Sequence, residues 1–320
     1  MAVLDWILSS DVAYCARLLG ESAPELLAVC ALLPGRARTA SILLGAANSV
    51  FLDEARREGV DPKTIAELRE RVLLAYAGTP RERPLDRAMA RLATEYGLPR
   101  IVLDAALEAA DWDASGRRYA TYHNLLDYCV RAGSAPAVGI TLLLGERDRD
   151  VLARAADLGV AIALTMIARD VSRHAREGRV LLPIEWLEDA GVDVDAWITD
   201  PHPNRGVHAV VTRVLSAAER FYRHADPGIR TIPPAYRPAV RALRYSHKVD
   251  ALYIGARSQD LHDRSPTTPV LQRVTAVIRG VRAAEARDQR GEPADGVWTL
   301  SQPPIPEALF LIDGCARPRP

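Results

Sequence analysis

The sequence predicts an all-α protein, and three observations carry this prediction. Apolar residues recur at spacings of three and four over much of the chain, which is the period of one helix face. Runs that alternate with period two are scarce, and no hairpin dipeptide joins two such runs. Stretches rich in proline and glycine fall between the periodic segments, near residues 80, 180, 203, 230 and 267.

The periodic segments predict a series of helices, which we place in chain order. The expected helices cover residues 41–59, 65–77, 86–96, 98–112, 151–177 and 270–290. Because each has an apolar face, packing these faces together would form one core, and we expect a single domain over residues 1–290. After it, "EPADG" and "SQPPIPE" predict an irregular tail over residues 291–320, with "LFLI" docking back onto the core.

The bulk composition argues against several classes of protein. The chain has 320 residues, of which 48% are hydrophobic and 26% charged, so it can bury a substantial core. Basic and acidic residues number 41 each, so no global basic field indicates nucleic-acid binding. Four scattered cysteines without a CxxC pair argue against structural zinc and a disulfide framework. The first residues lack a signal-peptide pattern and the apolar stretches look too short to span a bilayer, so we expect a cytoplasmic protein.

One face of the 151–177 helix turns polar at its end. Its members share helical spacing: Gly159, Ala163, Met166, Ile167, Asp170 and His174. A buried carboxylate without a partner is costly, so Asp170 should meet a cation. The candidates are His174, a metal ion, and the nearby arginines Arg169, Arg173, Arg176 and Arg179. A helix-end salt bridge to one of these arginines is the simpler interpretation.

The 41–59 helix repeats this pattern. Ile42, Ala46, Ser49 and Asp53 share one stripe, which is again apolar until it reaches a carboxylate. The simpler interpretation is that Asp53 and its neighbour Glu54 pair with Arg56 and Arg57 on a solvated face. Two helices that each end an apolar stripe in aspartate also suggest a shared site.

Several segments together resemble the squalene/phytoene synthase family. "MIARDVSRH" followed by "GRVLLP" resembles its second aspartate motif, and "ALLPGRAR" resembles its Leu-Leu-Pro-x-x-Arg turn. "RYATYHNLLDYC" resembles its central tyrosine-cysteine helix, and "AAERFYRHADPGIRTIPPAYRPAVRALRYSHKV" its late segment. The resemblance implies the isoprenoid-synthase fold, which is a bundle of helices around a deep central pocket. It also implies that two aspartate-rich helices face each other and hold Mg²⁺, which binds the diphosphate of an allylic isoprenyl substrate.

The sequence departs from the family pattern at both aspartate motifs. Ser49 stands where the first motif begins, and Ala46 stands where an arginine is usual. In the second motif Met166 replaces asparagine and His174 replaces the last aspartate. The stretch "YCVRAGSAPAVG" is also about two residues longer than usual, which leaves the pocket geometry there open.

The resemblance assigns roles residue by residue. The expected metal ligands are Asp170, Asp53 and His174, and the expected catalytic residues are Asp170, Tyr128 and Tyr245. His174 could equally well donate a hydrogen bond to phosphate. The expected substrate-binding residues are Arg169, Arg173, His174, Lys248, Arg264, Ser49, Ala46 and Met166.

The missing carboxylates lead to a specific functional hypothesis. Binding two diphosphates needs more ligands than this chain retains, so we expect one allylic diphosphate and a different acceptor. An electron-rich aromatic small molecule, such as a carbazole or an indole, would be prenylated, as in the aromatic prenyltransferase branch that serves bacterial secondary metabolism. Two alternatives remain, a head-to-head phytoene- or squalene-type synthase and a non-catalytic binding or assembly module. Peripheral membrane contact is expected only for a long-chain substrate.

Overall fold

The computed structural model describes residues 10–57, 60–257, 268–290 and 299–316. Within these ranges the chain forms helices and no strand. The first half contains α2 Ser10–Ser22, α3 Pro24–Cys30, α4 Gly35–Ala55, α5 Pro62–Tyr76, α6 Pro84–Thr94, α7 Ile101–Ala114, α8 Tyr122–Cys129, the π-helix η1 Val130–Ser134 and α9 Ala135–Leu143. The second half contains α10 Arg149–Arg169, α11 Val171–Arg176, α12 Ile184–Asp189, α13 Val194–Thr199, α14 Arg205–Thr231, α15 Arg237–Arg257, α16 Val270–Gln289, the 3₁₀ turn η3 Pro306–Ala308 and α17 Leu309–Cys315. The all-α prediction is confirmed.

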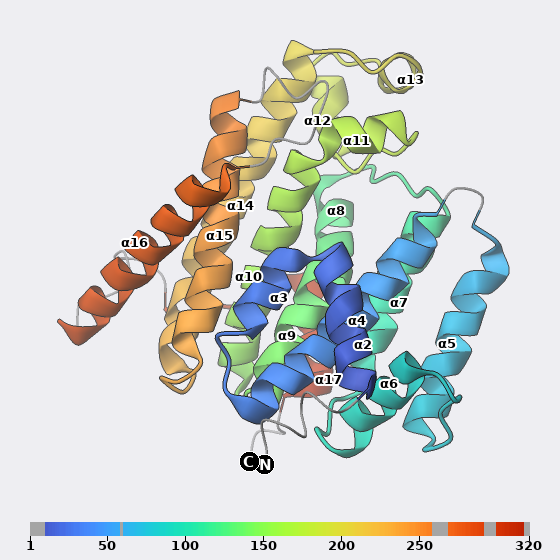
Figure 1. Ribbon diagram of the computed structural model, residues 1–320. Helices are drawn as coiled ribbons and strands as arrows, with labels where there is room; N and C mark the ends of the chain where they lie inside the picture. Colours follow the sequence, from blue (N-terminus) through green and yellow to red (C-terminus); the bar gives the residue numbers. More distant parts are fainter. Residues whose placement is uncertain (1–9, 58–59, 258–267, 291–298, 317–320) are drawn as a thin grey trace.

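The centre of the bundle is α10, which packs along α14 and also contacts α9, η1 and α15. Figure 1 shows α5 and α6 at one side of this centre and α15 and α16 at the other, with α11, α12 and α13 gathered at one end. By length and composition α10 could span a bilayer, contrary to our expectation for the apolar stretches. It is largely buried inside the bundle, however, which is typical of the core helix of a soluble fold.

Local sequence signals explain where several helices begin. Asp61 accepts a hydrogen bond from the backbone of Lys63 at the start of α5, and Asp148 caps α10 in the same way. Thr121 and Asn124 form a reciprocal capping box at the start of α8. These caps satisfy backbone N–H groups that a helix start leaves without partners.

Three predicted boundaries differ from the structure. The 151–177 segment is two helices, because the backbone of Asp170 leaves the helical region (φ −98°, ψ 12°) and separates α10 from α11. Pro227 was expected near a break, but α14 continues through it as far as Thr231. The tail contains helix α17, whose Leu311 and Ile312 are fully buried. The division into one domain and a tail stays a prediction.

A half-buried histidine on α14 predicts a pH effect on stability. Desolvation, together with the charges of Arg154 and Arg220, lowers the pKa of His224 to about 4. The unfolded chain therefore binds this proton first, so the folded state loses stability as pH falls from about 6.5 towards 4. Between pH 7.5 and 4.5, the free energy of unfolding of His224→Gln should fall by about 1 kcal/mol less than that of the original protein. This value is reduced because His224 is partly exposed.

Urea denaturation of both proteins at the two pH values measures this difference. The pH 7.5 data serve as the internal reference, since the histidine is neutral there in both the folded and the unfolded state. Identical pH slopes for the two proteins would contradict the prediction.

Candidate functional site

At the break between α10 and α11, the carboxylate of Asp170 contacts two guanidinium groups. Arg169 donates to both oxygens of Asp170, with Nε–Oδ1 and Nη2–Oδ2 distances of 3.0 Å. Arg173, one turn later, donates to Oδ2, also at 3.0 Å. The side chain of Asp170 is only 8% exposed. The salt bridge that the sequence suggested is therefore present, with two arginines rather than one.

Helix α11 continues this polar chain. Arg173 donates to Glu177 at 3.0 Å through Nη1, and its Nη2 lies 3.2 Å from Nε2 of the buried His174. Because a guanidinium only donates, Nε2 must accept, and we assign the ring proton to Nδ1, which has no hydrogen-bond partner. Gly178 then turns the backbone at φ 71°, and Arg179 follows it.

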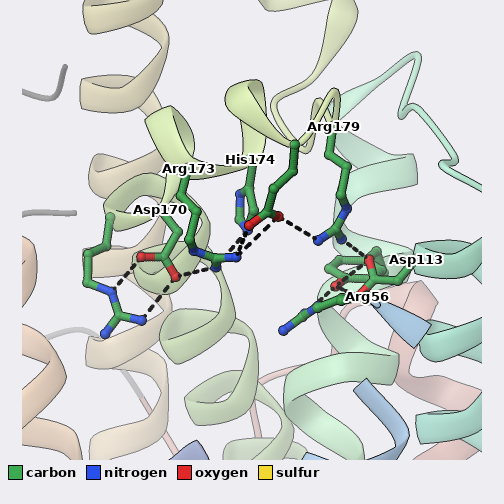
Figure 2. A network of polar contacts seen from close by, with 9 residues as sticks. Arg56, Asp113, Asp170, Arg173, His174 and Arg179 are labelled. Carbon is green, nitrogen blue, oxygen red and sulfur yellow. Dashed lines mark hydrogen bonds and ion pairs between the residues drawn. The ribbon is translucent and has the colours of Figure 1, made fainter. Parts of the chain in front are cut away.

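Arg179 reaches across the bundle to a second buried carboxylate, Asp113 at the end of α7. Asp113 also accepts a hydrogen bond from Arg56 Nε at 2.8 Å and lies 3.0 Å from the hydroxyl of Tyr128. Arg56 follows α4 directly, and its Nη2 lies 3.2 Å from the Tyr128 hydroxyl. Five elements of the bundle therefore meet at one polar network (Figure 2).

We call this set the arginine network. It contains four arginines, three carboxylates, one histidine and one tyrosine: Arg56, Asp113, Tyr128, Arg169, Asp170, Arg173, His174, Glu177 and Arg179. Cations outnumber anions, so it offers positive charge to a ligand. Polyanions such as diphosphate are the ligands that suit clustered guanidinium groups.

Burial and charge set the protonation states. Burial alone would raise the pKa of Asp170, but the hydrogen bonds and charges of Arg169 and Arg173 outweigh it and hold that pKa well below its usual range. Desolvation, assisted by Arg173 and Arg179, lowers the pKa of His174 well below 6.5. Desolvation and Asp113 raise the pKa of Tyr128 above its ordinary value. At neutral pH Asp170 is therefore ionised, while the imidazole of His174 and the phenol of Tyr128 are neutral.

Other predicted residues lie outside the arginine network. Asp53 is exposed and accepts a hydrogen bond from Ser22 on α2. Ala46 is fully buried in the core, Ser49 is half-buried, and Met166 is 38% exposed. Among the described residues, therefore, no contact joins the two predicted aspartates, Asp53 and Asp170.

The predicted residues of α15 face elsewhere. Lys248 forms an ion pair with Glu219 of α14 at 3.0 Å. The ring of Tyr245 lies against Gly280 of α16, where an added Cβ would approach the ring to 2.6 Å. Both residues line an apolar groove between α15 and α16. Arg264, the remaining predicted substrate-binding residue, lies outside the described residues.

Asp113 was not among the residues predicted from the sequence. Val102, Ala106, Ala109 and Asp113 share one stripe of α7, which is apolar until its last turn. This is the same pattern that drew attention to Asp170. A uniform search for apolar stripes ending in a carboxylate would have found both residues.

The segment after Tyr128, which the sequence predicts to be longer than usual, forms the π-helix η1 between α8 and α9. A π-helix holds an extra residue without ending the helix, and such turns are frequent at functional sites. Tyr128 therefore lies just before a π-helical turn that joins α8 to α9.

Comparison with known proteins identifies the family. The squalene/phytoene synthase family model matches residues 19–279. The phytoene synthase of Cereibacter sphaeroides is 36% identical over 98% of this chain and 90% of its own length. That of Rhodobacter capsulatus is also 36% identical, over 97% of this chain and 91% of its own length.

Solved structures agree with this fold. A dehydrosqualene synthase, solved with a ligand, superposes with a TM-score of 0.79 over 89% of this chain and 99% of its own, at 18% identity. A squalene synthase from Alicyclobacillus acidocaldarius gives a TM-score of 0.70 over 79% and 95%, at 20% identity. The predicted isoprenoid-synthase architecture is confirmed.

These comparisons overturn one prediction. The hypothesis of an aromatic acceptor is wrong, because relatives at 30–36% identity over most of the chain carry the name phytoene synthase. The alternative of a head-to-head synthase agrees better with these names. Members of this family transfer prenyl groups from isoprenyl diphosphates. The chain belongs to the squalene/phytoene synthase family of prenyl-transferring enzymes.

Proposed function

We propose that this protein condenses two allylic isoprenyl diphosphates head to head, with geranylgeranyl diphosphate as the substrate. The observation that carries this proposal is the 36% identity to a phytoene synthase across 98% of the chain. The reaction breaks the C1–O bond of each substrate and releases two diphosphates and two protons. One hydrocarbon with a new central double bond forms, and no reductant is consumed.

The arginine network suits the charge that this reaction creates. As each C–O bond breaks, its electron pair leaves with the diphosphate, and negative charge grows on the departing group. Guanidinium donors already oriented by buried carboxylates stabilise such a charge without reorganising. Arg56 and Arg173 remain partly exposed, at 26% and 38% of their side chains, so they can contact a ligand.

A small apolar cavity lies beside the central helix α10. It lies between α9, α10, α14 and α15, has a volume of about 50 Å³, and is lined by residues such as Ile140, Ala155, Leu158, Ile229 and Val240. Leu158 precedes Asp170 by twelve residues, which is about 18 Å along α10. Apolar walls of this kind protect an allylic cation from water.

Magnesium fits the described residues poorly. Enzymes of this family generally use Mg²⁺ to bind diphosphate. Among the described residues, however, no group of three or more His, Cys, Asp or Glu side chains is placed to hold a metal ion. Of the predicted ligands, Asp170 accepts hydrogen bonds from Arg169 and Arg173, while Asp53 accepts a hydrogen bond from Ser22. We therefore assign no step of the reaction to a metal.

Product analysis tests the proposed function. The purified protein is incubated with geranylgeranyl diphosphate alone, without reductant, in magnesium buffer and in chelator, with farnesyl diphosphate in parallel. We expect a hydrocarbon that contains both prenyl skeletons, with two diphosphates released per product. Diphosphate release without a condensed hydrocarbon, or no release in either buffer, would contradict the proposal.

Replacement of Asp170 by asparagine should reduce turnover by about 10²–10³-fold. The amide no longer holds Arg169 and Arg173 by charge, so both lose the orientation that stabilises the leaving diphosphate. Both arginines remain partly exposed, so the free energy of unfolding should fall by only about 1–2 kcal/mol. Initial rates with geranylgeranyl diphosphate, together with urea denaturation, measure the two effects.

The matched control is Asp189→Asn on α12, which removes the same charge from an exposed position. It should leave both the rate and the stability near their original values. Full activity of Asp170→Asn would show that Asp170 does not serve the site.

A further inference from the structure

The two buried carboxylates of the arginine network already accept hydrogen bonds on all four of their oxygens. Both oxygens of Asp170 accept from Arg169, and one of them also accepts from Arg173. Asp113 is engaged in the same way by Arg56, Arg179 and Tyr128. Its side chain is 1% exposed. A divalent ion would compete with these arginines for the same oxygens.

Displacing an arginine is unfavourable at this place. Removing the carboxylate partner would leave Arg179, whose side chain is 12% exposed, with only Glu177 at 3.7 Å as a counterion in a largely buried position. Mg²⁺ also demands near-octahedral oxygen ligands and loses its own water reluctantly. The network is therefore more stable as an arginine–carboxylate array than as a set of metal ligands.

The same network retains donors that nothing in the described structure satisfies. Arg179 Nη1 is buried and makes no hydrogen bond, with its nearest carboxylate oxygen, from Glu177, at 3.7 Å. Nδ1 of His174 is also buried without a hydrogen-bond partner. Buried donors without partners are rare in folded proteins and call for an acceptor. Diphosphate oxygens supply several acceptors within one ligand.

We propose that the arginine network binds a substrate diphosphate directly, through Arg56, Arg173 and Arg179, without a bridging divalent metal. Asp113 and Asp170 act as positioning residues that hold these guanidinium groups in place. The inference rests on the proposed function only for the identity of the ligand as a prenyl diphosphate. Guanidinium–phosphate pairing is charge-assisted and often bidentate, so three arginines can replace the charge that a metal would supply.

Calorimetric titration tests this inference without turnover. The probes are inorganic pyrophosphate and a non-hydrolysable geranylgeranyl thiodiphosphate, each titrated in excess chelator and in magnesium at constant ionic strength. We expect binding in chelator and no tightening on addition of magnesium. Absence of binding in both buffers, or binding at least about tenfold weaker in chelator, would overturn the inference.

A pair of variants locates the binding site. Arg173→Gln should weaken binding of both probes in chelator by about tenfold, since it removes one partly exposed charge-assisted donor. Arg100→Gln is the control, because it removes a similarly exposed arginine beside Asp104 at the opposite end of α7 from Asp113. Equal affinities for the two variants would overturn the assignment to this network. Circular dichroism confirms that both variants are folded.

The two proposals can fail separately. Metal-independent binding without hydrocarbon formation would refute the head-to-head reaction and leave the arginine site standing. Hydrocarbon formation with strictly magnesium-dependent binding of the probes would support the head-to-head reaction and refute metal-independent binding at the arginine network.

Discussion

Asp113→Asn should reduce the free energy of unfolding by about 3–5 kcal/mol, because it breaks a buried ion-pair network by removing one partner. The carboxylate of Asp113 joins Arg56 and Arg179 and lies 3.0 Å from the Tyr128 hydroxyl. An amide keeps the shape of the side chain but removes its charge. Arg56 then loses its carboxylate partner, and Arg179 keeps only Glu177, at 3.7 Å, as a counterion. Urea denaturation at neutral pH measures the loss.

Asp111→Asn, two residues earlier on α7, is the control. Asp111 forms an ion pair with Arg69 in which both side chains are 48% exposed. Surface pairs of this kind contribute about 0.2–1 kcal/mol, so the variant should be nearly as stable as the original protein. Similar losses for the two variants would mean that burial does not determine the strength of these pairs.

The fold was predictable from local signals. The 86–96 segment became α6 and the 98–112 segment became α7, each within a few residues, because a helix depends on spacing and capping within one stretch of chain. The pairing of Asp170 with Arg169 and Arg173 was also predictable, since these residues are one and three positions apart.

The rest of the site depends on contacts across the bundle. Arg179 was a candidate partner for Asp170, only nine residues away, but it pairs instead with Asp113, which is 66 residues away. The spacing of residues in one helix carries no information about such a partner. The break at Asp170 is similarly set by tertiary context, since its own sequence continues the helical pattern.

The error about the acceptor has a physical cause. The family pattern has aspartates where this chain has Ser49 and His174. The loss of those aspartates affects how a diphosphate is bound. It does not determine which nucleophile attacks the allylic cation, because that choice depends on the shape and depth of an apolar pocket. A guanidinium array can bind the leaving group in place of a metal, so a missing metal ligand does not require a different acceptor.

The crossing of η1 and α10 predicts the second large effect. Gly159 on α10 lies directly against the backbone of the π-helix, and an added Cβ would lie 2.5 Å from Ser134 Cα and 2.6 Å from the carbonyl carbon of Gly133. These neighbours are backbone atoms, which cannot rotate away as a flexible side chain can. Gly159→Ala should therefore force the two helices apart and destabilise the protein by about 3 kcal/mol. Thermal unfolding followed by circular dichroism measures the loss.

Gly255→Ala separates this steric effect from helix propensity. Gly255 is exposed in the last turn of α15, and an added Cβ would make only an ordinary contact, 3.7 Å from Leu215 Cδ1. Alanine favours a helix over glycine by up to about 1 kcal/mol, so this variant should be as stable as the original protein or slightly more stable. The two substitutions are chemically identical and should act in opposite directions. If Gly159→Ala were also neutral, the two helices would have room to separate, and Tyr128, which lies just before η1, would not depend on their close contact for its position.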